Sequence, residues 1–111
     1  MARAIAFGSK RSGSNEIWTK PTARGDARPI TKNGFYNQYP VWSPDGQEIV
    51  FYSKRANSRG IWRVPYTAGE ERPVATIASR EARPLRWSAD QKIYFQNGGE
   101  LFRVDLASGE S

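Results

Sequence analysis

Ile49-Val50-Phe51 occurs three times, with small changes, in this chain of 111 residues. Ile5-Ala6-Phe7 stands 44 residues before it, and Ile93-Tyr94-Phe95 stands 44 residues after it. A second apolar stretch follows each copy, as Glu16-Ile17-Trp18, Gly60-Ile61-Trp62 and Glu100-Leu101-Phe102. Self-similarity at a fixed period indicates that the chain is built from copies of one structural unit.

The repeated unit has the properties of a β-propeller blade. A period of about 40–45 residues is typical of a blade, which is a sheet of four short strands. Ile49 and Phe51 alternate with Val50 and Tyr52 as in a strand, and both sets are apolar, as expected where neighbouring sheets cover both faces. Turn-forming residues separate such segments along the chain, which argues against helices. We therefore predict an all-β repeat protein of antiparallel four-stranded propeller blades, with about 2.5 blades per chain.

Each blade is divided into strands A to D, from the propeller axis outward. The strands expected in the central unit cover residues 39–43, 48–53, 60–65 and 72–77. The whole chain, residues 1–111, is expected to form a single partial propeller domain. Its blades are placed at about 1–32 (strands B to D), 39–77 (A to D) and 83–111 (A to C).

A tight turn is expected between strands A and B of the central unit, at Ser43-Pro44-Asp45-Gly46. Proline presets φ at the second position of such a turn, and Gly46 tolerates a positive φ. Asp45 is interpreted as a cap of its own turn rather than a cation ligand, and Asp90 in the same way. The third unit has Ala89-Asp90-Gln91 at this place, so its turn is expected to differ.

Four segments of the central unit, taken in order, resemble the WD-like repeat of TolB-type six-bladed propellers. They are Trp42-Ser43-Pro44-Asp45-Gly46, Ile49-Val50-Phe51, Ser53-Lys54-Arg55 and Ile61-Trp62. The resemblance implies the propeller fold. It also implies bacterial relatives with several functions: a periplasmic protein that binds a lipoprotein through its channel face, gating domains of prolyl-oligopeptidase-like hydrolases, and sensor regions of regulators.

The composition excludes most catalytic sites. The chain has neither His nor Cys, so it lacks the commonest general base, a thiolate and the usual zinc ligands. It contains no G-x-S-x-G segment, and a Ser-His-Asp triad cannot be assembled without His. We expect the chain not to be an enzyme and to use no metal or cofactor.

The net charge of +6 is spread along the chain, which favours a solvated surface over a nucleic-acid site. Lys10-Arg11 and Lys54-Arg55 fall on equivalent loops between strands B and C. There, bracing of the loop through carbonyl groups or the turn carboxylate is favoured over contact with phosphate. Nucleic acid is therefore not expected as a partner.

No segment is apolar enough for a signal peptide or a membrane span, so a membrane is not expected as a partner either. As it stands the chain is expected to be soluble and cytoplasmic. The compartment stays open, because a longer parent could carry a signal and the family it resembles is often periplasmic.

Three blades in a row do not form a ring, since propellers have about 4–8 blades. We expect two chains to associate head to tail as a homodimer with six blades, in which each junction joins the last blade of one chain to the first blade of the other. The alternatives are a fragment of the gating propeller of a prolyl-oligopeptidase-like hydrolase, and a structural fragment with no ligand.

The least repetitive segment is residues 33–39, the crossover from strand D to strand A, which is expected at the mouth of the central channel. A peptide or protein partner would be bound there, with arginines opposite the aromatic and amide side chains. The alternative is that the crossover only packs. The residues expected on this ligand face are Phe35, Tyr36, Asn37, Tyr39, Arg80 and Arg83.

The tryptophans occupy repeated positions, which favours packing between blades over stacking on a ligand. Trp18, Trp62 and Phe102 share one position in strand C. Trp42 and Trp87 share a position in strand A, with one residue inserted between Pro84 and Trp87 relative to the central unit.

Overall fold

The computed structural model describes residues 4–56, 58–77 and 82–106, and every regular element in these ranges is a β-strand. The ten strands are β1 (Ala4–Ser9), β2 (Glu16–Pro21), β3 (Arg28–Pro29), β4 (Tyr36–Trp42), β5 (Glu48–Arg55), β6 (Ser58–Pro65), β7 (Arg72–Ile77), β8 (Ala82–Trp87), β9 (Lys92–Asn97) and β10 (Glu100–Asp105). Over the same ranges there is no helix long and apolar enough to cross a membrane.

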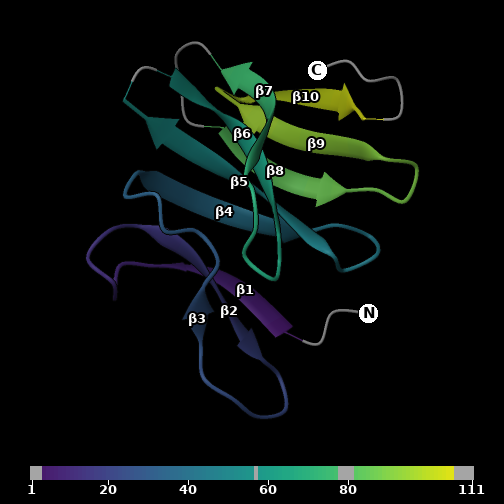
Figure 1. Ribbon diagram of the computed structural model, residues 1–111. Coiled ribbons are helices and arrows are strands. Elements are labelled where there is room, and N and C mark those ends of the chain that lie inside the picture. Colours follow the sequence, from purple (N-terminus) through teal and green to yellow (C-terminus); the bar gives the residue numbers. More distant parts are fainter. Residues whose placement is uncertain (1–3, 57, 78–81, 107–111) are drawn as a thin grey trace.

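The strands form three antiparallel sheets that follow one another along the chain (Figure 1). The first contains β1 to β3, the second β4 to β7 and the third β8 to β10, each in chain order. The innermost strands of neighbouring sheets touch, since β4 contacts both β1 and β8. The prediction of an all-β fold made of antiparallel propeller blades is confirmed.

Strand β5 is covered on both faces, as the alternation of its apolar residues predicts. Ile49 and Phe51 are fully buried in a cluster with Ile17 of the first sheet. Val50 and Tyr52 point the other way and are buried in a cluster with residues of the third sheet. Complete burial of one such side chain contributes about 1.5–3 kcal/mol, so β5 holds the three sheets together.

Strand A of the second sheet begins at Tyr36, earlier than predicted, and contains a β-bulge. The pairing of β4 with β5 shifts between Gln38 and Val41, and Tyr39 has a φ of +62°. Aligning the second and third units by Pro40 and Pro84 does not reveal this bulge. In both sheets the residue four places before the tryptophan, Gln38 or Arg83, is paired regularly with strand B. The predicted one-residue insertion before Trp87 is therefore wrong. The two strands have equal length from Gln38 or Arg83 to the tryptophan, and Pro40 and Pro84 occupy different positions within them.

The turn from β4 to β5 is closed by the side chains predicted for it. The Ser43 hydroxyl donates to Asp45 Oδ1 at 2.7 Å, and the Gln47 amide donates to the same oxygen at 3.0 Å. Gly46 has a φ of +73°. In the third sheet Ser88 still donates to Asp90, and Gln91 takes the left-handed position with a φ of +66°. That turn is one residue shorter, because Ser88 bonds Lys92 where Ser43 bonds Glu48.

Gly60 allows β6 and β7 to approach closely. The pairing of these strands shifts between Ile61 and Trp62. A Cβ atom at Gly60 would lie 2.3 Å from the carbonyl oxygen of Ala75, which belongs to backbone and cannot easily move. The first and third units have glutamate at this repeat position, so the sequence pattern does not show the constraint.

We predict that Gly60→Ala lowers the free energy of unfolding by about 1–3 kcal/mol, because the added methyl group forces β6 and β7 apart. Gly8→Ala is the control, since its Cβ would meet only the flexible end of the Gln38 side chain. Urea denaturation of both variants measures the difference. Equal stability of the two variants would contradict the close approach at Gly60.

Candidate functional site

The residues predicted to form one ligand face are distributed over three environments. Asn37 points into the interior. Phe35 and Tyr36 line a hollow beside the β5–β6 hairpin, and Tyr39 lies with Arg83 in a groove on the inner strands. Arg80 lies outside the described residues.

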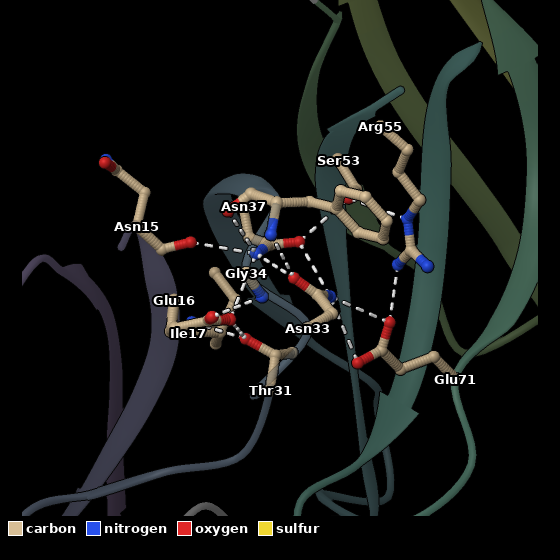
Figure 2. A network of polar contacts seen from close by, with 11 residues as sticks. Asn15, Glu16, Ile17, Thr31, Asn33, Gly34, Asn37, Ser53, Arg55 and Glu71 are labelled. Carbon is tan, nitrogen blue, oxygen red and sulfur yellow. Dashed lines mark hydrogen bonds and ion pairs between the residues drawn. The ribbon is translucent and has the colours of Figure 1, made fainter. Parts of the chain in front are cut away.

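Asn37 is fully buried, and its amide group is used entirely within the protein (Figure 2). Its Nδ2 donates to the carbonyl oxygen of Asn15 at 2.8 Å and to Oδ1 of Asn33 at 2.9 Å. Its Oδ1 accepts a bond from the Ser53 hydroxyl at 2.8 Å. The side chain therefore links the first sheet, the crossover and β5, and it is not presented to a ligand at the surface.

The carboxylate of Glu16, at the start of β2, is buried and well supplied with donors. It accepts bonds from the Thr31 hydroxyl at 2.6 Å and from the Gly34 amide at 2.9 Å. Asn37 donates a further bond to it at 3.1 Å. Bonds to an ionised acceptor are stronger than neutral ones, so Glu16 holds the crossover against the first sheet.

Arg55 extends this network to the loop between β6 and β7. Its guanidinium group pairs with Glu71, and its Nε donates to the Ser53 hydroxyl at 3.0 Å. The guanidinium carbon lies 3.6 Å from the ring centroid of Trp62. Asn33 donates to Glu71 at 3.0 Å and so connects the crossover to the loop between β6 and β7. Arg55 is held by Glu71, Ser53 and Trp62, and not by the carbonyl groups or turn carboxylate named in the prediction; Asp45 lies beyond the other end of β5.

The corresponding junction between the second and third sheets lacks this arrangement among the described residues. Ala82, also fully buried, pairs with Asn97 where Asn37 pairs with Ser53. Gly60 stands in place of Glu16. Sequence reasoning missed the network, although two of its members stand where the repeat changes: Gly60 replaces Glu16, and Ala82 replaces Asn37.

A groove runs across the inner strands of all three sheets and has a volume of about 390 Å³. Its walls combine apolar side chains with the polar groups of Gln38, Tyr39 and Arg83. The Arg83 guanidinium carbon lies 5.3 Å from the ring centroid of Tyr39. The lining residues are Ala6, Phe7, Gln38, Tyr39, Pro40, Val41, Arg83, Pro84 and Leu85.

The hollow beside the β5–β6 hairpin is larger, at about 670 Å³, and more basic. Phe35 and Tyr36 share it with Lys54, Arg55 and Arg59. The Arg55 guanidinium lies 5.1 Å from the Phe35 ring centroid and is already paired with Glu71. The charge of Arg55 is therefore largely neutralised by Glu71 and stabilises the fold.

The repeated aromatic residues pack within and between blades. Trp18 is buried under the Arg11 guanidinium, whose carbon lies 5.0 Å from its ring, as Arg55 lies over Trp62. Phe102 stacks on Phe95 at 5.6 Å between ring centroids. At the other repeated position, Trp42 packs against Tyr66, and the indole of the buried Trp87 donates to Gln91 at 3.3 Å.

Hydrogen bonds lower the pKa of both turn carboxylates. The hydrogen bond from Ser43, followed by that from the Gln47 amide, lowers the pKa of Asp45 below its ordinary value of 3.8. The hydrogen bond from Ser88 and then that from Lys92 lower the pKa of Asp90, and Asp90 in return raises the pKa of Lys92. The described residues contain no group of three or more His, Cys, Asp or Glu that could hold a metal ion.

We predict that Asn37→Ala lowers the free energy of unfolding by about 1–3 kcal/mol, because it leaves buried partners such as Glu16 with unmet hydrogen bonds. Asn15→Ala is the matched control, since Asn15 contributes only its main-chain carbonyl to the bonds of Asn37. Urea denaturation compares the two. A network that contributes nothing would show the same midpoint for both variants.

We also predict that Asp45 stabilises the fold near neutral pH and not in strong acid. A carboxylate with a lowered pKa in the folded state contributes stability above its unfolded pKa and loses it as the pH falls through the folded value. Asp45→Asn should therefore be less stable than the unmodified chain at pH 7, and the difference should shrink as the pH falls below 3.8 and through the lowered pKa of the folded state. Denaturant midpoints measured across this range test it. A difference that stays constant down to pH 2 would refute the role of the charge, and Asp90→Asn provides a parallel test.

Neither a protein-family model nor a curated protein matches the sequence. Among solved structures, TolB from Acinetobacter baumannii is similar over 97% of this chain and 28% of its own, with 20% identity and a TM-score of 0.81. A putative TolB from Agrobacterium tumefaciens is similar over 84% of this chain and 34% of its own, with 22% identity and a TM-score of 0.73. The chain thus spans about a third of the length of these proteins. Its three sheets have the fold of consecutive blades of a TolB-like β-propeller.

Proposed function

We propose that this chain is a non-catalytic β-propeller scaffold that associates with itself and binds an extended peptide or protein segment on its channel face. The groove across β1, β4 and β8 supports the binding role. These are the innermost strands of the three sheets, so a segment lying in the groove would contact all three blades at once.

The observation that carries the proposal is the bulge that places Tyr39 beside Arg83. A positive φ at a residue other than glycine costs about 1–3 kcal/mol and is often found where it serves a binding site. Bulges also redirect side chains at the edges of sheets. Here the bulge at Tyr39 lies in the wall of the groove, and the ring lies under the Arg83 guanidinium.

The chemistry of the groove fits a segment that combines apolar and acidic groups. Val41 and Pro84 offer apolar surface, and Arg83 offers a cation that is shielded on one side by an aromatic ring. Gln38 can donate and accept hydrogen bonds with a peptide backbone. The lining contains no carboxylate and the chain contains no His or Cys, so the groove has groups for recognition and lacks the commonest general bases and nucleophiles.

Selection from a phage-displayed dodecapeptide library, followed by fluorescence polarisation with the enriched synthetic peptides, tests this function. We expect Arg83→Ala and Tyr39→Ala to weaken binding at least tenfold, because each removes a group that faces the groove. Lys54→Ala, in the hollow beside the β5–β6 hairpin, is the control and should leave the affinity unchanged.

Two outcomes would reject the channel-face site. Enriched peptides that bind the Arg83 and Tyr39 variants as tightly as the original chain would place the site elsewhere. A library that yields no enriched peptide would support the alternative of a structural fragment with no ligand.

A further inference from the structure

The outermost sheets expose apolar side chains whose repeat equivalents are completely buried. Ile5 is 57% exposed, while Ile49, at the same repeat position, is fully buried. Leu101 is 67% exposed, while its equivalent Ile61 is fully buried. We call Ile5 and Phe7 the first end face, and Leu85, Tyr94 and Leu101 the last end face.

The two junctions inside the chain show what covers a face of each kind. At the first junction Ile49 and Phe51 of β5 pack on Ile17 of β2. At the second junction Ile93 and Phe95 of β9 lie in one buried cluster with Ile61 of β6. Each junction therefore joins an Ile-x-Phe strand B to the aliphatic residue at the second position of strand C in the preceding sheet.

The two end faces are the two halves of such a junction. The first end face carries Ile5 and Phe7, the equivalents of Ile49 and Phe51. The last end face carries Leu101, the equivalent of Ile17, beside a groove of about 640 Å³ lined by Leu85, Tyr94 and neighbouring residues. The groove has the apolar character needed to receive Ile5 and Phe7.

We infer that the last end face binds the first end face of a second copy of this chain, and that the second copy does the same in return. This inference rests on the self-association in the proposed function, and it names the surfaces and the direction of the contact. An interface between unlike faces closes into a ring only if the rotation from one unit to the next is that of the ring. The sheets follow the arrangement of TolB blades with a TM-score of 0.81, so the rotation inside the chain is that of a propeller.

Cross-linking tests the contact without reliance on a destabilising substitution. The chain has no cysteine, so Ile5→Cys and Leu101→Cys each introduce one defined attachment point. Treatment of an equimolar mixture with a short bismaleimide should give a product of twice the chain mass of 12.5 kDa. Each variant treated alone should give none, because like faces do not meet in a head-to-tail ring. A cross-linked product from either variant alone would overturn the inference.

Sedimentation velocity of Asp variants gives a second, independent measurement. Ile5→Asp and Leu101→Asp should each be monomeric, because each places a carboxylate in both junctions of the ring without a partner. An equimolar mixture of the two should recover a dimer, since one of its two junctions then contains no substitution. Ala23→Asp, in the exposed loop after β2, is the control and should sediment as the unmodified chain does.

The outcomes separate this inference from the channel-face function. A monomeric mass of the unmodified chain at every concentration, or open oligomers that grow with concentration, would overturn ring closure while leaving peptide binding intact. Loss of peptide selection from a chain that still forms the cross-linked dimer would reject the channel-face function and leave the junction standing.

Discussion

A β-strand that is apolar on both faces is stable only when a second sheet covers each of them. Strand β5 is such a strand: Ile49 and Phe51 face the first sheet, and Val50 and Tyr52 face the third. This requirement keeps the three sheets packed together, because removing the first or the third sheet would expose a complete row of large β5 side chains to water. The bulges, the turns and the groove on the inner strands all lie on sheets that are positioned by this packing on the two faces of β5.

The two internal junctions meet the same requirement with different chemistry. Around the first, the polar network of Glu16, Asn37 and Arg55 adds directional bonds to the apolar contact. At the second, Ala82 replaces Asn37 and the described contacts are mainly apolar. Directional bonds specify one relative position of two sheets, whereas apolar contact tolerates some sliding. The first junction is therefore the more precisely defined of the two.

The repeat predicts the fold well, because spacing and alternation reflect local strand geometry and burial that every blade shares. The closing bonds of the turns at Asp45 and Asp90 are also local, and they follow from residue type. The β-bulge at Tyr39 and the burial of Asn37 could not be predicted in this way. Both depend on how neighbouring sheets meet, and Asn37 looks like an ordinary loop amide until its partners from distant parts of the chain are known. For the same reason the predicted ligand face divides among the described residues: Tyr39 and Arg83 share one groove, Phe35 and Tyr36 share another hollow, and Asn37 is buried.

Gly60 gives the units of this chain a fixed order. The first unit has Glu16 at the equivalent position, and that carboxylate is the centre of the polar network. Copying the glutamate into the second unit is blocked by the carbonyl oxygen of Ala75. Recombination between repeats would exchange these units. Such an exchange would place the glutamate against this carbonyl and remove the centre of the network, so the product would be less stable than the present order.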